Sequence, residues 1–283
     1  MRRKWITVLI LFVGVIPFVA ISIVPLLSTV FNPNQSTATP VDTAAIEQVQ
    51  NQTAELEAQE KGYQLVLERE PKNATALEGL VMARLQLIQM GQREIKSVIQ
   101  PLQTLAELQP EQTDYSVLLG QAQQQTGDRE GAAQTYQRVL AKAPGNLNAL
   151  RGLVDLYLEQ DRPQAAIGLV EETLQQADQA NQLQPGTVDI SSVKLLLGDI
   201  YLNQQQFDDA LALFQNLAKE NPNDFRPVLA QAMTLTNQGK AKDAAPLYAQ
   251  AVTLAPPQYK DQIQQTAEQA ETLSQPSPES SPE

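Results

Sequence analysis

The sequence predicts an all-α protein in which pairs of helices stack into a solenoid, preceded by a single transmembrane helix. A large side chain followed eight positions later by proline recurs along the chain, at Tyr63–Pro71, Leu102–Pro110, Tyr136–Pro144, Phe214–Pro222 and Tyr248–Pro256. Two of the intervals between these prolines are 34 residues long, and a fixed period in this range is typical of stacked-repeat proteins. From Asp42 onward, apolar residues recur at spacings of three and four without an alternating strand pattern, which indicates helices.

The N-terminal segment predicts the membrane anchor. Residues 6–31 carry no charge over 26 residues, which exceeds the roughly 20 residues that cross a bilayer core of about 30 Å. Basic residues 2–4 precede this run and the next charge is Asp42, so we expect a cytoplasmic N-terminus with the remaining chain across the membrane. The alternative is a signal peptide cleaved near Ser36 and Ala38. The apolar run is about twice the length of a normal signal core, which favours the anchor.

The composition argues against several classes of function. The chain has no cysteine and no histidine, so it lacks thiolate chemistry and also the commonest general base and metal ligand. Without basic residues 2–4 it has 17 basic and 32 acidic side chains, a net charge of about −15. Nucleic acid would repel such a body. We therefore expect no enzyme activity, no cofactor or metal, no nucleic-acid partner and no small-molecule substrate.

The repeats resemble the tetratricopeptide repeat (TPR) family, whose members form right-handed superhelical solenoids of antiparallel helix pairs. The clearest copy carries the family's small, turn, aromatic and proline residues, at Leu119, Gly120, Gly127, Asp128, Ala132, Tyr136 and Pro144. A second copy has the corresponding residues at Leu197, Gly198, Tyr201, Ala210, Phe214 and Pro222. The resemblance covers about four-fifths of the chain and implies that same fold here.

The repeat positions divide the chain into five parts. These are a basic flank (1–5), a transmembrane anchor (6–31), a polar linker (32–41), the solenoid (42–273) and a tail (274–283) that we expect to be disordered. Within the solenoid we expect a leading helix or half-repeat, five repeats and a capping helix, at residues 42–71, 74–110, 113–144, 147–184, 191–222, 225–256 and 259–273. No proline follows Val170 at the usual distance, so we expect that helix to continue about two turns further.

Three packing expectations follow from the repeat pattern. Gly120 and Ala132 are small residues at the positions where the two helices of a repeat should cross most closely. Arg84 stands where the family prefers an aromatic residue, so the pairing of its repeat is the least regular. Lys194 occupies an otherwise apolar position, and its ammonium is expected to reach outward, toward Asp199 or a bound partner.

The resemblance also implies a binding site, because in TPR proteins the first helix of each repeat lines a concave groove that holds partner peptides. The corresponding positions in this sequence are Glu78, Met82, Leu85, Asp114, Gln121, Gln124, Asn148, Arg151, Asp155, Leu195, Asp199, Leu202, Arg226, Leu229 and Met233. The lysines and asparagines with which some members grip a chaperone's C-terminal carboxylate are missing. The residues present suggest a neutral or basic partner segment with apolar anchors. The alternative is an ordinary solvated helix face.

Together these features predict a membrane-anchored scaffold or assembly factor for client proteins. The plan is similar to membrane-anchored TPR factors of photosynthetic membranes, among them photosystem I assembly factors. Such clients would lie on the cytoplasmic side, whereas the charges place the domain on the periplasmic or lumenal side, of a thylakoid or plasma membrane if the source is cyanobacterial. The alternatives are a periplasmic envelope or cytochrome c maturation scaffold, or a self-associating structural protein.

Overall fold

The computed structural model describes residues 43–274 of the chain. The predicted basic flank, anchor and linker, and all but the first residue of the predicted tail, therefore lie outside the described residues. Among residues 43–274, no helix combines the length and the apolar character that a membrane crossing needs.

Residues 43–274 form twelve α-helices and one 3₁₀ helix, with no strand among them, which confirms the all-α prediction. The helices are α3 (Thr43–Arg69), α4 (Ala74–Gln89), η1 (Ile95–Val98), α5 (Ile99–Leu108), α6 (Thr113–Gln125), α7 (Arg129–Lys142), α8 (Leu147–Glu159), α9 (Pro163–Leu183), α10 (Ile190–Asn203), α11 (Phe207–Glu220), α12 (Phe225–Asn237), α13 (Ala241–Leu254) and α14 (Pro257–Ser274).

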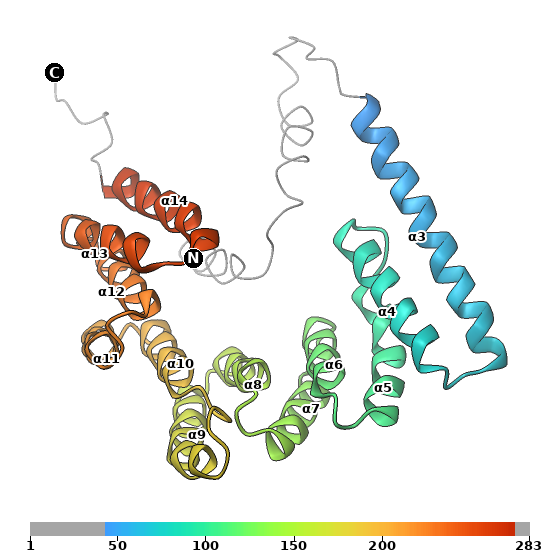
Figure 1. Ribbon diagram of the computed structural model, residues 1–283, viewed down its shortest axis with the longest axis horizontal. Coiled ribbons are helices and arrows are strands. Elements are labelled where there is room, and N and C mark those ends of the chain that lie inside the picture. The colour runs from blue at the N-terminus through green and yellow to red at the C-terminus, as the bar shows by residue number, and fades with distance from the viewer. Residues whose placement is uncertain (1–42, 275–283) are drawn as a thin grey trace. The chain divides into compact units, whose positions relative to one another are not determined.

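The chain divides into two compact units, residues 1–52 and residues 53–283. The structure describes only residues 43–52 of the first unit, and they belong to helix α3. In the second unit, each first helix packs against the second helix that follows it, and this second helix packs against the next first helix. The first helix α8 also contacts the first helices α6 and α10 directly, and lies between them in Figure 1.

The turn inside each of four consecutive repeats contains a residue with left-handed backbone geometry. These residues are Gly127, Asp161, Gln205 and Gly239, with φ angles of 85°, 57°, 58° and 75°. They occupy the same position of the repeat, directly after the first helix and its cap. Only two of the four are glycine, the residue that adopts this geometry without steric cost, so the turns at Asp161 and Gln205 carry local strain.

Aromatic rings fill the space that glycine leaves between neighbouring helices. Tyr136 of α7 is completely buried. Its ring lies between two first helices, so close to Gly120 and Gly152 that a Cβ atom added at either glycine would lie within 3.0 Å of it. The Tyr136 ring therefore fills the space beside Gly120. Ala132 is also fully buried, in the same cluster as the ring. The position of the large side chain, and not only that of the small ones, sets the helix spacing.

Side chains of α3 contact helix α4. The Tyr63 ring lies against Gly79, at the same sequence offset as Tyr136 and Gly152. Beside it, the Glu60 carboxylate, whose side chain is 8% exposed, accepts hydrogen bonds from Arg84 Nε at 2.7 Å and Arg93 Nε at 3.0 Å. Arg84 thus replaces the family's aromatic residue with a buried ion pair, which explains this departure from the repeat pattern.

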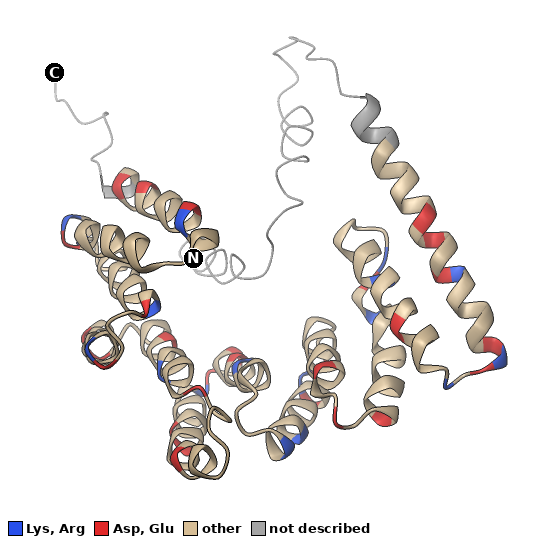
Figure 2. Ribbon diagram, viewed as in Figure 1, with Lys and Arg blue, Asp and Glu red and all other residues tan. Residues whose placement is uncertain are grey.

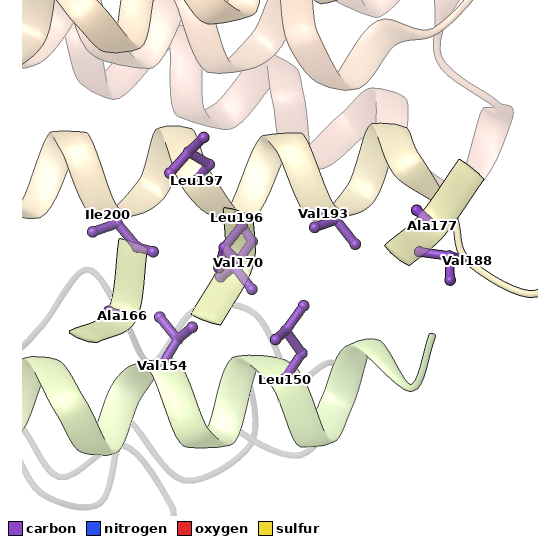
Figure 3. Packing of buried hydrophobic residues seen from close by; sticks show 10 residues of the cluster. All are labelled: Leu150, Val154, Ala166, Val170, Ala177, Val188, Val193, Leu196, Leu197 and Ile200. Atoms are coloured by element: carbon purple, nitrogen blue, oxygen red, sulfur yellow. The ribbon is translucent and has the colours of Figure 1, made fainter. Parts of the chain in front are cut away.

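The long helix α9 keeps α8 and α10 together. Its last turns add Ala177 to a core cluster that also contains residues of α8 and α10, and Figure 3 shows Leu150 of α8 and Val193 of α10 pointing toward each other within this cluster. Asn181 holds the loop after α9 through two hydrogen bonds. Its side-chain oxygen accepts from the Val188 N–H and its side-chain nitrogen donates to the Val188 carbonyl, both at 2.9 Å. The extra residues before α10 therefore extend this core and do not separate the repeats.

Candidate functional site

Polar side chains join three consecutive first helices across one surface of the second unit, which we call the first-helix face. It consists of the outward positions of α4, α6, α8, α10 and α12. Arg151 of α8 forms an ion pair with Asp199 of α10 at 3.5 Å, and Gln124 Nε2 of α6 donates to Glu159 of α8 at 2.9 Å. The side chains of Arg151 and Asp199 remain 47% and 50% exposed. Figure 2 marks charges of both signs on α8 and α10.

Asp155 lies one helical turn after Arg151 and one turn before Glu159. Partial desolvation raises the pKa of Asp155 to about 6; Arg151 opposes this rise, whereas the nearby Glu159 and Asp199 carboxylates add to it. Desolvation likewise raises the pKa of Asp199, against the influence of Arg151. Carboxylates therefore outnumber arginines at the centre of the first-helix face. A nearby cation would favour the ionised forms of Asp155 and Asp199.

A second group of polar contacts borders Asp155. Glu159 also accepts a hydrogen bond from Arg129 Nε of α7 at 3.4 Å, and the Tyr136 hydroxyl donates to Gln124 Oε1 at 3.4 Å. Burial raises the pKa of Tyr136, and Asp155 and Glu159 raise it further, so this phenol stays neutral. The buried ring that spaces the helices thus also fixes a polar side chain of the first-helix face.

The apolar residues expected in the groove fall into two groups. Met82 of α4 and Met233 of α12 are 60% and 37% exposed and stand at the same repeat position as Asp155 and Asp199. Leu195, Leu202 and Leu229 are instead half-buried and pack against the neighbouring hydrophobic clusters. Leu85 is half-buried as well. The methionines are therefore the accessible apolar side chains of this face, and all four leucines belong partly to the core.

Two predicted groove residues are occupied by contacts within the protein. Glu78 accepts hydrogen bonds from Tyr115 Oη at 2.7 Å and Gln109 Nε2 at 3.0 Å. Arg226 is held by Asp224, Ser192 and Asp189. Both residues join adjacent repeats.

The remaining predicted positions Asp114, Gln121 and Asn148 are exposed.

Asp199 is one of the partners expected for Lys194 from the sequence, and the structure pairs Lys194 with another residue. Its ammonium pairs with Glu220 of α11 at 2.8 Å, because it points along the boundary between α10 and α11. The sequence pattern did not identify Glu159 or Arg129 as residues of this face. The sequence signal for their contact was that each lies one or two residues from the turn of its repeat, and that the two repeats are adjacent.

The repeat geometry agrees with a sequence comparison. The profile of the tetratricopeptide repeat matches residues 82–256, more than half of the chain. The chain belongs to the tetratricopeptide repeat family. A search of curated protein sequences found no significant match.

Solved structures of other TPR proteins share this fold. A TPR protein from Parabacteroides merdae is 15% identical with a TM-score of 0.51, and the match covers 87% of this chain and 89% of that one. Yeast Tom70 is 13% identical with a TM-score of 0.52, covering 76% of this chain and 43% of Tom70, less than half of its length. A thermophilic TPR protein from Thermus thermophilus is 18% identical with a TM-score of 0.46, covering 69% and 99%. At these identities, the two matches with TM-scores above 0.5 show the fold alone.

Proposed function

We propose that this TPR protein is a scaffold that holds segments of client proteins on its first-helix face. The observation that carries the proposal is the line of polar contacts across α6, α8 and α10, in which Arg151 and Asp199 hold each other in place while about half of each side chain stays exposed. A surface whose side chains are already ordered loses little conformational entropy when a partner binds, so more of the contact energy appears as affinity.

The exposed methionines support the same surface. Met82 and Met233 present flexible, polarizable side chains at the two outer first helices, α4 and α12, and such side chains adapt to apolar residues of different shapes. Binding hot spots combine a few desolvated apolar contacts with charges that set orientation. The first-helix face contains both kinds of residue, so it suits an extended client segment.

Client capture from native membrane extracts tests this function. The variant Asp199→Lys combined with Met233→Glu alters the charge at the centre of the face and its accessible apolar end. The matched control, Glu172→Lys, changes an exposed residue of the second helix α9. We expect the face variant to lose client capture about tenfold or more, whereas the control retains it. Equal capture by all three proteins, or loss only in the control, would contradict the proposal.

We propose further that residues 6–31 anchor the scaffold in a membrane, with the TPR domain on the periplasmic or lumenal side. The support is the uncharged run of 26 residues and the three basic residues before it. Protease added to the cytoplasmic face of sealed vesicles should leave the TPR domain intact. Digestion from that face would reverse the topology. It would then favour a client-assembly role on the cytoplasmic side, as in the TPR factors of photosynthetic membranes.

A further inference from the structure

We propose that Asp155 and Asp199 determine which client segments bind, by selecting segments that carry a lysine or arginine. This inference rests on the proposed function of the first-helix face and adds the chemistry of the partner. It assigns to Asp155 the role of the residue that meets the partner's cation, with Asp199 of the neighbouring first helix beside it.

Charged side chains from three helices surround Asp155. Its own helix supplies Arg151 one turn before it and Glu159 one turn after it, α10 supplies Asp199, and α7 supplies Arg129. The Arg151 guanidinium contacts Asp199 and the Arg129 guanidinium contacts Glu159. Three carboxylates therefore share two arginines, and the structure shows no hydrogen bond or ion pair from the Asp155 carboxylate to any described side chain.

The remaining neighbours of Asp155 supply no further positive charge. Gln124 of α6 is neutral, and the Tyr136 hydroxyl of α7 is a neutral donor already directed at Gln124. A cation from outside the chain would thus balance the charge of the third carboxylate. Lysine and arginine side chains supply such a charge, with several N–H donors for adjacent carboxylates.

The half-exposed ion pair gives the partner a route into the site. Arg151 and Asp199 meet at 3.5 Å with about half of each side chain in solvent, and exposed pairs of this kind contribute only about 0–1 kcal/mol. A partner's lysine can therefore contact both Asp155 and Asp199 while Arg151 turns toward solvent or a partner carbonyl. The raised pKa of Asp155 agrees with this arrangement, since a cation would restore the ordinary ionised state.

A peptide selection tests the inference with the full-length protein in detergent micelles. The probe is a phage-displayed library of random peptides of about 12 residues, the length of a segment that a groove can hold. The selections use the native protein, the isosteric variant Asp155→Asn with Asp199→Asn, and the control Asp178→Asn. Asp178 is an exposed acid on helix α9, away from the first-helix face. Circular dichroism verifies that all three proteins have the same helical content.

We expect lysine and arginine to be at least about twofold more frequent in peptides selected on the native protein and on the control than in those selected on the double variant. The enrichment should also fall when the selection is carried out at pH 5, below the pKa of about 6 of Asp155. Selected peptides without this enrichment would overturn the inference and leave the proposed function intact. If no peptide is enriched above background on any of the proteins, the proposed function itself fails.

Discussion

The Arg151 guanidinium on α8 lies 3.5 Å from the Asp199 carboxylate on α10, although the 21-residue helix α9 intervenes in the chain. Residues 48 positions apart are therefore neighbours because the first helices of successive repeats contact each other directly. The pair lies on the surface, so its contribution to folding is small. Its position on the first-helix face gives it a role in recognition, if clients bind there.

The first prediction separates recognition from stability at this pair. Asp199→Lys should change the free energy of unfolding by less than about 1 kcal/mol, because the side chains of Arg151 and Asp199 are both about half exposed. Urea denaturation followed by circular dichroism measures this change. A loss of several kcal/mol would show that the pair supports the fold, and reduced client capture by this variant would then say nothing about the binding surface.

The second prediction concerns pH. Asp155 has an ordinary pKa of 3.8 and a folded-state pKa of about 6, so the folded protein binds the proton more tightly than the unfolded chain. The contribution of Asp155 to the free energy of unfolding should therefore fall as pH rises from about 4 to about 6. Asp155→Asn should remove this part of the pH dependence and stabilise the protein above pH 6 by about 1 kcal/mol, less than the full shift implies because solvent screens the group. Asp178→Asn is the control, and an unchanged pH profile in Asp155→Asn would refute the assignment.

The third prediction concerns the spacing of helices by Tyr136. Gly152→Ala would place a methyl group within 3.0 Å of the Tyr136 ring, and overpacking of this kind typically costs about 1–3 kcal/mol. Gly168→Ala is the matched control, since nothing lies within 4 Å of the added Cβ on helix α9. It should instead stabilise the protein by about 0.5–1 kcal/mol. Thermal melts of both variants measure the difference, and equal melting temperatures would mean that the ring does not set the helix spacing.

The fourth prediction concerns the strained turn at Gln205. With φ at 58°, this glutamine has a left-handed backbone that costs about 1–2 kcal/mol for a residue with a Cβ. Gln205→Gly should raise the free energy of unfolding by up to about 1 kcal/mol, because glycine's greater freedom in the unfolded chain offsets part of the gain. Gln204→Gly, one residue earlier and without positive φ, should destabilise the protein. The same sign for both variants would contradict the turn geometry.

The sequence predicted the repeating architecture because its signals are local and strong. Proline ends each second helix regardless of what packs against it, and the missing proline after Val170 correctly indicated that α9 runs on to Leu183. Contacts between side chains were harder to predict. The repeat spacing alone does not show that the Tyr136 ring packs against both Gly120 and Gly152. A side chain's direction on a helix decides its contacts, and spacing does not reveal that direction.

Predictions of the binding surface were limited for the same reason. The repeat position placed Glu78 and Arg226 in the groove, but each has hydrogen-bond partners in a neighbouring repeat. Conversely, Glu159 and Arg129 pair across repeats, a contact that depends on the stacking distance. The left-handed turn at Gln205 also had no sequence signal, because glutamine has no preference for that geometry.

Site-specific photocross-linking in native membranes tests most directly whether clients bind the first-helix face. A photoreactive amino acid replaces Gln121 or Met233 on this face, or Glu130 or Glu172 on the second helices α7 and α9, and all four positions are exposed. We predict client adducts from Gln121 and Met233 and none from Glu130 or Glu172. Adducts from the second-helix positions alone would place clients on the opposite surface and contradict the account.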